Sequence, residues 1–257
     1  MRWSTLLSVT ACSLGLLGCV GKEESRSSTK PKAKSVMLLE PAELQNRLSE
    51  PGLRILDTRS KEDYDVGHVP NAVWVDVKSW QALGKRMGGF HDTEAWAAKV
   101  SQVGVSSDSR VVVYGNRLSN TARIWWLLKY VGAENVMLLN GGWGLWMKEQ
   151  RPIEHDHAEL GTVATSFTPR FDTDRLMERG PLKDLLGSEQ VTLVDTRSTG
   201  EFTGKDARGP RGGHIPGATH LEWKELITAG GRFKTIPQLQ GLFRERGILP
   251  TNTAVCY

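Results

Sequence analysis

The sequence has little cysteine: only Cys12, Cys19 and Cys256 occur among its 257 residues. So few thiols exclude a disulfide framework, and their spacing does not match a zinc-binding set. The apolar stretch at about residues 6–17 is too short to span a bilayer as a helix. Neither sign of charge dominates, because the formal net charge is only +4, with the positive charges mostly scattered. This balance gives no case for nucleic acid as a partner.

What is present is typical of a soluble globular protein. Hydrophobic residues make up 39% of the chain and charged residues 24%, both close to the usual values. The length is sufficient for two ordinary domains.

The N-terminus reads MRWSTLLSVTACSLGLLGC. A basic start, a short apolar stretch and a small residue before a cysteine predict a signal peptide over residues 1–18. The segment Leu16-Leu17-Gly18-Cys19 resembles the bacterial lipobox, in which cleavage precedes the cysteine and its thiol carries lipid. We therefore expect lipidation of Cys19, a place in the bacterial cell envelope on the periplasmic side, and a flexible polar tether over residues 19–35. A plain signal peptide is the alternative.

Two parts of the sequence repeat each other. The first reads LRILDTRSKEDYDVGHVPNA from Leu53, and the second reads VTLVDTRSTGEFTGKDARGPRGGHIPGA from Val191. Each has an apolar strand ending in Asp-Thr-Arg, then an acidic-aromatic pair, then Gly-His-(Val/Ile)-Pro-x-Ala. The second copy carries an insert before its histidine, His214. A repeat this long indicates a duplicated domain rather than a solenoid.

A second match lies further along each copy. VGVSSDSRVVVY ends at Tyr114, and RGILPTNTAVCY ends at Tyr257. Gly104 and Gly247 precede these tyrosines by the same interval, so the two segments align without a gap. Cys256 then corresponds to Val113, a strand position.

Strands alternate with helices in the first copy. Apolar segments predict strands at residues 54–58, 72–76, 110–114 and 135–139, and helices are predicted at residues 41–49, 92–104 and 120–132. This alternation predicts an α/β fold with a parallel sheet flanked by helices.

These motifs resemble the rhodanese family in its tandem form, the thiosulfate and mercaptopyruvate sulfurtransferases. The resemblance runs from about Val36 to the last residue and includes LNGGWGLW, which closes the first copy. It implies two rhodanese-like domains, at residues 36–150 and 167–257, joined by a linker at residues 151–166. The first would be non-catalytic, and the second would be catalytic but incomplete.

The resemblance implies a sulfurtransferase that moves a sulfane sulfur from thiosulfate to cyanide or a thiol acceptor. In the family that it resembles, a cysteine opens a short loop after a strand of the second domain and becomes a persulfide. Backbone N–H groups at the following helix N-terminus would stabilise its thiolate.

Gly115 stands at this position in the first copy and offers no nucleophile. Ser119, Asn120 or Thr121 is expected to cap the helix that follows. In the second copy the position lies directly after Tyr257. We therefore expect the sequence to be truncated before its active-site loop and the chain as given to be inactive. Cys256 as nucleophile is an alternative that needs a two-residue shift of the repeat.

The insert of the second copy supplies candidate substrate-binding residues, namely Lys205, Arg208 and Arg211. A guanidinium suits thiosulfate because its donors form a fork, and Arg208 best matches the substrate arginine of the family. Glu201 replaces an arginine found in mercaptopyruvate-specific members and in some thiosulfate members, and this departure favours thiosulfate as the donor. A solvated basic loop is the alternative.

The remaining polar motifs have structural interpretations. His68 and His214 are expected to hold loops, and Arg59 and Arg197 to form ion pairs. The segment EHDH at residues 154–157 is a poor metal site because its ligands are adjacent and unsupported, so neither a metal nor a cofactor is predicted. Two other functions stay open: a catalytically inactive rhodanese-like binding module at the membrane surface, and a phosphatase of the same fold with a longer loop.

Overall fold

The computed structural model describes residues 37–156 and 166–257. Its larger sheet belongs to the first copy of the repeat, and all its strand pairs are parallel. The strands are β1 (Leu38–Leu39), β2 (Leu53–Asp57), β3 (Ala72–Trp74), β4 (Arg110–Tyr114) and β5 (Asn135–Leu139), in the order β1-β5-β4-β2-β3. Their valine, leucine and isoleucine side chains suit a sheet that is buried on both faces.

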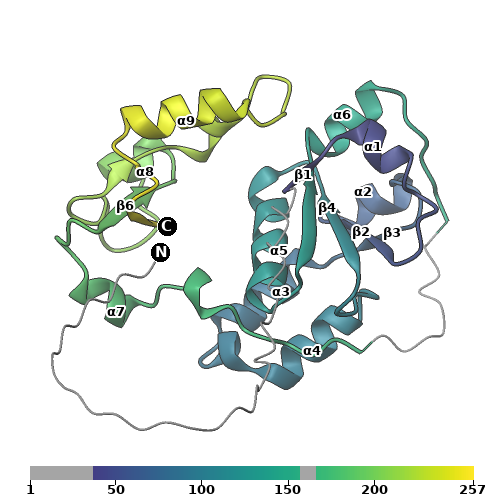
Figure 1. Cartoon of the computed structure of the whole chain (residues 1–257), viewed down its shortest axis with the longest axis horizontal. Helices are drawn as coiled ribbons and strands as arrows, with labels where there is room; N and C mark the ends of the chain where they lie inside the picture. The colour runs from purple at the N-terminus through teal and green to yellow at the C-terminus, as the bar shows by residue number, and fades with distance from the viewer. Residues whose placement is uncertain (1–36, 157–165) are drawn as a thin grey trace, which may run out of the picture. The chain divides into compact units, whose positions relative to one another are not determined.

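Helices cover both faces of this sheet (Figure 1). They are α1 (Pro41–Gln45), α2 (Lys61–Val66), α3 (Val77–Lys85), α4 (Thr93–Ser101), α5 (Leu118–Tyr130) and α6 (Gly142–Lys148), with a 3₁₀ turn η1 (Gly89–His91) before α4. One core contains Trp80, Trp96 and Ile124 from α3, α4 and α5. The other contains Leu44, Tyr64 and Trp146 from α1, α2 and α6. These two cores hold the strand ends of the first copy in fixed positions.

The second copy has a smaller sheet in the order β7-β6-β8. Its elements are β6 (Val191–Asp195), β7 (Thr219–His220), β8 (Thr253–Cys256), α7 (Arg179–Asp184), α8 (Thr199–Thr203) and α9 (Ile236–Glu245), with 3₁₀ turns η2 (Thr173–Arg175) and η3 (Trp223–Leu226). Both strand pairs of this sheet are parallel. Only four hydrophobic residues described after position 165 are buried: Phe167, Leu193, Val194 and Leu221. The second copy therefore has a much smaller core than the first.

The α/β fold with parallel sheets and flanking helices is confirmed. The four strands predicted in the first copy coincide with β2, β3, β4 and β5, and the three predicted helices contain α1, α4 and most of α5. Four elements of the first copy had no prediction from the sequence, namely β1, α2, α3 and α6.

The expected capping of α5 is wrong. The helix begins at Leu118, and its N-cap residue is Arg117, which makes no side-chain capping bond. Because only three residues separate β4 from α5, the helix starts before Ser119 and Asn120. Thr121 lies inside the first turn and donates its hydroxyl to the Arg117 carbonyl, 3.1 Å away, as threonines inside helices often do.

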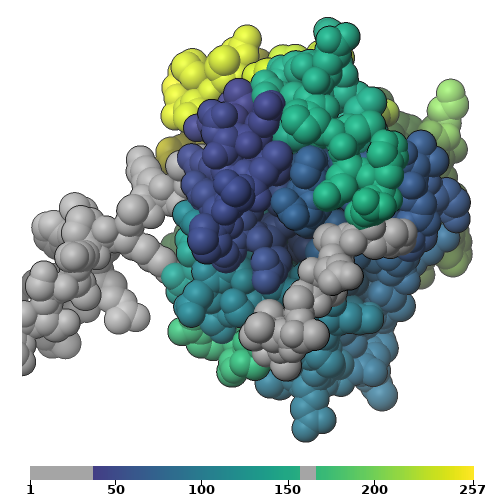
Figure 2. Space-filling model, turned by 90° about the vertical axis from the view of Figure 1, so that its right-hand side faces the viewer, coloured from purple at the N-terminus to yellow at the C-terminus, as the bar shows by residue number. Residues whose placement is uncertain are grey.

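The chain between the two copies packs against the first copy where it is described. Residues 153–156 follow α6 in the chain, and Glu154 forms an antiparallel β-bridge with His68. Phe167, which the repeat assigns to the second copy, packs into the core beneath α4 and α5. In Figure 2 the residues of β1 and α1 lie beside those of α6, where Arg151 Nη1 donates to Gln45 Oε1 over 2.6 Å.

Among the described residues, no helix is both long enough and apolar enough to cross a membrane.

Candidate active site

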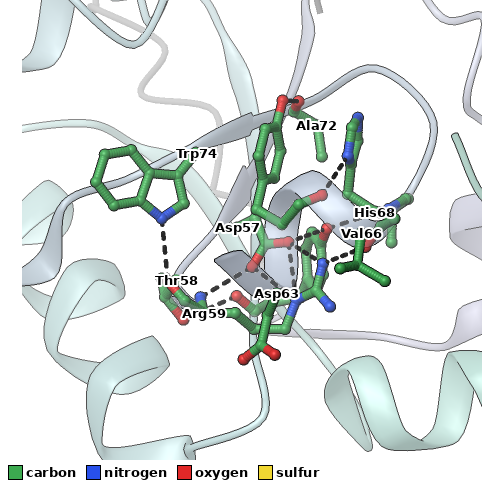
Figure 3. A network of polar contacts seen from close by, with 12 residues as sticks. Asp57, Thr58, Arg59, Asp63, Val66, His68, Ala72 and Trp74 are labelled. Atoms are coloured by element: carbon green, nitrogen blue, oxygen red, sulfur yellow. Dashed lines mark hydrogen bonds and ion pairs between the residues drawn. The ribbon is translucent and has the colours of Figure 1, made fainter. Parts of the chain in front are cut away.

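The Asp-Thr-Arg motif of the first copy forms a buried ion-pair network at the end of β2 (Figure 3). The Asp57 carboxylate accepts hydrogen bonds from Arg59 Nη2 at 2.6 Å and from the Tyr114 hydroxyl at 2.6 Å. Arg59 Nη2 also donates to the carbonyl of Gly67, 2.6 Å away. The guanidinium lies 3.9 Å from the ring centre of Trp143. The motif therefore ties the ends of β2 and β4 to the Gly-His loop.

The ionisation of this network follows from its burial. Burial alone would lower the pKa of Arg59, but the hydrogen bonds and charge of Asp57 outweigh it and raise that pKa. The pKa of Tyr114 lies well above its usual value because of burial and the charge of Asp57. Arg59 thus stays charged and Tyr114 stays a hydrogen-bond donor, as a structural ion pair requires.

The second copy repeats the network at the end of β6. Arg197 Nη2 lies 2.5 Å from Asp195 Oδ2 and donates to the Gly213 carbonyl over 2.9 Å. Burial alone would raise the pKa of Asp195, but hydrogen bonds from Arg197 and Tyr257 outweigh it and lower that pKa. The Arg197 side chain is 33% exposed, compared with 3% for Arg59. The expected ion pairs of both arginines are confirmed, and the second is more open to solvent.

Gly115 follows β4, where the loop of the first copy begins. A Cβ atom at this position would overlap the hydroxyl oxygen of Thr58 and lie 2.9 Å from that of Thr121. The Gly115 carbonyl accepts a hydrogen bond from the amide of Trp143, at 3.0 Å. The surrounding side chains therefore leave no room for a nucleophilic residue at position 115.

An open pocket of about 530 Å³ lies at this edge of the first sheet. Residues 58–63, 74–78, 116–117 and 120 line it, so it is formed by the carboxyl ends of β2 and β3 and the start of α5. Open α/β folds bind ligands at such edges. The first copy has the position of an active site but no nucleophile at Gly115.

Cys256 is the last residue of β8 and is paired with Val194 of β6. In the first copy Val113 is paired with Leu56 in the same way, so the strand register agrees with the alignment of the two copies. Cys256 is an exposed free thiol, yet partial desolvation raises its pKa. A thiol with a raised pKa is a poor nucleophile near neutral pH.

The three candidate substrate-binding residues Lys205, Arg208 and Arg211 all lie on one exposed loop between α8 and the second Gly-His motif. Arg208 Nε forms an ion pair with Glu201 Oε1 at 2.6 Å, and its side chain is 85% exposed. Burial alone would raise the pKa of Glu201, but hydrogen bonds from Ser198 and the charge of Arg208 outweigh it and lower that pKa. Glu201 therefore holds Arg208 through Nε, and the two terminal nitrogens of the guanidinium bond to no residue in the part of the chain that the structure describes.

Sequence reasoning missed this link between Glu201 and Arg208. The signal available was Ser198-x-x-Glu201, which forms a capping box at the start of α8. That motif fixes the glutamate at the base of the insert.

Both Gly-His loops are held by their histidines, as predicted. His68 is buried, stacks on Tyr64 at 4.0 Å and places Nδ1 2.9 Å from the Tyr64 carbonyl. His214 stacks on Phe202 at 3.8 Å and places Nδ1 2.8 Å from the Phe202 carbonyl.

Some predictions fall outside the described residues. The signal peptide, the lipid attachment site Cys19, Cys12 and the tether at residues 19–35 precede residue 37. Part of the linker at residues 157–165, including His157, is also not described. Within residues 37–156 and 166–257, no group of three or more metal-ligating side chains comes together.

Comparison with known proteins agrees with this geometry. Residues 40–149 and 178–257 match the Rhodanese-like domain family. A thiosulfate sulfurtransferase of Corynebacterium glutamicum is 35% identical over 83% of this chain and 74% of its own length. One from Azotobacter vinelandii is 31% identical over 86% of this chain and 82% of its own length.

The fold also resembles a solved structure, SseA from Escherichia coli, described as a 3-mercaptopyruvate sulfotransferase with the rhodanese fold. The similarity covers 86% of this chain and 88% of that one, with a TM-score of 0.72 and 24% identity. At this sequence identity the similarity is evidence for the fold alone.

Proposed function

Because this chain belongs to the rhodanese family, we propose that it acts as a sulfurtransferase that takes the sulfane sulfur of thiosulfate and passes it to cyanide or a thiol. The two relatives from Corynebacterium glutamicum and Azotobacter vinelandii, both thiosulfate sulfurtransferases, support this activity. The observation that carries the proposal is the repeated strand-end network, Asp57–Arg59–Tyr114 in one copy and Asp195–Arg197–Tyr257 in the other.

The nucleophile that we propose is a cysteine directly after Tyr257 in the natural protein. The support comes from the matching register of β4 and β8. It also comes from two equivalent bonds, because Thr58 N donates to the Tyr114 carbonyl over 2.9 Å and Thr196 N donates to the Tyr257 carbonyl over 3.0 Å. A side chain after Tyr257 would leave the sheet at the carboxyl ends of its strands. A helix N-terminus beyond it would lower the thiol pKa.

The proposed reaction has two balanced steps. In the first, the cysteine thiolate attacks the outer sulfur of thiosulfate, the sulfur–sulfur bond of thiosulfate breaks, and sulfite leaves with the bonding electron pair. In the second, cyanide or a thiolate attacks the terminal sulfur of the persulfide and the cysteine thiolate leaves. No external oxidant or reductant is needed, since each bond formed replaces one sulfur–sulfur bond.

Arg208 is the residue proposed to attract the donor, with Arg211 and Lys205 adding positive charge. The open terminal nitrogens of Arg208 support this role, because a guanidinium fork fits an oxyanion. Glu201 supports thiosulfate rather than mercaptopyruvate as the donor, because it stands where mercaptopyruvate-specific members of the family carry an arginine.

A second candidate function is a binding module without catalytic activity. The sealed position at Gly115 and the raised pKa of Cys256 favour it, because neither position then supplies a reactive thiolate. The residue after Tyr257 separates the two candidates. A cysteine there, followed by a short loop, supports sulfur transfer, and a residue that is not a nucleophile supports the binding module. A longer loop with an arginine would support the phosphatase.

For the location of the protein we propose a lipid anchor on Cys19 that holds residues 37–257 at the periplasmic side of a bacterial membrane. The support is the Leu16-Leu17-Gly18-Cys19 segment and the polar tether after it. Two or more acyl chains would anchor the protein stably. Mass spectrometry should find an acylated Cys19 at the mature N-terminus, and Cys19→Ala should release the protein into the soluble fraction. A mature chain that begins at a residue other than Cys19 and carries no lipid would contradict this proposal.

The experiment for the catalytic proposal is thiocyanate formation from thiosulfate and cyanide by the natural gene product, translated to its own stop codon. Serine in place of the proposed cysteine should abolish turnover, whereas Cys256→Ser should keep most of it. Arg208→Ala should mainly raise KM, because Arg208 is proposed to bind the donor and takes no part in the making or breaking of the sulfur–sulfur bonds. Loss of activity in Cys256→Ser alone would show that the register is wrong.

A further inference from the structure

The Gly-His loop of the first copy binds an extended segment of the same chain. His68 N donates to the Glu154 carbonyl, Glu154 N donates to the His68 carbonyl, and both bonds are 2.9 Å long. Asn71 N donates to the Glu154 carboxylate over 2.7 Å, and the Asp156 carbonyl lies 3.1 Å from His68 Nε2. The loop is therefore a short edge onto which an acidic peptide adds by antiparallel pairing.

The Gly-His loop of the second copy reproduces the inner side of this edge. Ile215 N donates to the Tyr257 hydroxyl over 2.9 Å, as Val69 N donates to the Tyr114 hydroxyl over 3.1 Å. The Ala218 amide donates to the Ile215 carbonyl over 3.0 Å. His214 also stacks on Phe202 as His68 stacks on Tyr64, so the second loop shares these inner contacts with the occupied first loop.

Its outer side has no partner within residues 37–156 and 166–257. No described residue forms a hydrogen bond with the amide, the carbonyl or Nε2 of His214. The same is true of the Gly217 amide. At Gly67 an added Cβ would meet His155 and Ile153 of the docked segment within 3.6 Å, whereas at Gly213 nothing lies within 4 Å. The second loop thus presents, to solvent, the same groups that hold Glu154 in the first.

We propose that residues 213–218 bind an extended acidic segment of a partner protein, through antiparallel pairing at His214 and a carboxylate on the Gly217 amide. The first loop, with Glu154 in place, shows what such an occupant looks like. Charge favours an acidic occupant, because the insert that precedes this loop adds Lys205 and Arg211, which are exposed and unpaired among the described residues. The inference does not depend on sulfur transfer.

The test uses the peptide that the first loop already binds, residues 151–156 with blocked ends, added to the isotope-labelled chain. Amide NMR signals of His214 and Gly217 should shift and saturate with a Kd on the order of 0.1–1 mM, as expected for so few contacts. Signals of His68 and Asn71 should not move, because their loop is occupied.

Matched peptides and variants identify the contacts. Methylation of the peptide nitrogen at Glu154 should weaken binding about tenfold, since it removes the donor to the His214 carbonyl. The same change at His155, whose amide makes no hydrogen bond to the described residues, should have little effect. Arg211→Glu should weaken binding, whereas Arg244→Glu, an exposed charge on α9, should not.

Three results would overturn the proposal. One is the absence of saturable shifts at His214 and Gly217 with millimolar peptide. Another is an equal loss of binding with either methylated peptide or with either arginine variant. The third is a response confined to His68 and Asn71, which would mean that the peptide only exchanges with the segment already docked.

Discussion

Replacing one carboxylate in each strand-end network should destabilise the two copies by very different amounts. Asp57 is fully buried and its partner Arg59 has only 3% of its side chain exposed. Asp57→Asn would leave the guanidinium buried without a counter-charge, which costs about 3–5 kcal/mol in comparable sites. Asp195→Asn removes the same charge beside Arg197, which is 33% exposed. Solvent screening should reduce that cost to about 1 kcal/mol.

Urea unfolding followed by tryptophan fluorescence measures the larger effect. Seven of the nine tryptophans lie between residues 74 and 146, so the signal reports mainly on the first copy. A loss of about 4 kcal/mol corresponds to a midpoint shift of about 2 M urea for a slope of about 2 kcal/mol per M.

A double variant serves as the control. Arg59→Met combined with Asp57→Asn should recover much of the stability, because the uncompensated charge is gone and an apolar side chain fills the site. The contrary result is that Asp57→Asn lowers the free energy of unfolding by less than about 1 kcal/mol, or by as much as Asp195→Asn does. Either result would refute the conclusion that the Asp57–Arg59 pair is buried and the Asp195–Arg197 pair is open to solvent.

Further expectations follow from individual positions. Gly115→Cys should destabilise the first copy in urea and add no thiocyanate formation, since Thr58 and Thr121 fill the space of its Cβ; a gain of activity would contradict this. The Asp195 carboxyl has a lowered pKa in the folded chain, so its contribution to stability is present above about pH 4 and is lost as the pH falls further. Stability should therefore depend less on pH in this acidic range in Asp195→Asn, and an unchanged pH dependence would contradict this expectation. Iodoacetamide should alkylate Cys256 more slowly at pH 7 than a small free thiol, and the gap should close at high pH, because its pKa is raised; a faster reaction would point back to Cys256 as a nucleophile. Limited proteolysis should leave a fragment that includes residues 37–156, since the segment at Glu154 is bonded to the first loop; early cleavage between residues 151 and 156 would speak against that bonding.

The fold was readable from the sequence because its strands are short, apolar and repeated. RVVVY and NVMLL form β4 and β5 with the predicted bounds, since buried parallel strands require continuous runs of such side chains. The register of β8 followed from the equal spacing of Gly104–Tyr114 and Gly247–Tyr257.

Other features depend on contacts between distant residues, which local patterns do not reveal. The start of α5 was misplaced because Ser119, Asn120 and Thr121 are all good capping residues, whereas the chain leaves β4 in a tight turn that begins the helix at Leu118. The docking of Glu154 on His68 was missed because the polar linker has no periodicity. The ion pair of Arg208 with Glu201 depends on how the insert folds back.

The most direct test of the proposed sulfur transfer is mass spectrometry of the natural gene product after incubation with thiosulfate and removal of excess donor. We expect the added mass of one sulfur atom on a cysteine directly after Tyr257, and its loss, with formation of thiocyanate, when cyanide is added. Sulfur found on Cys256 instead, or no sulfur bound at all, would contradict the account.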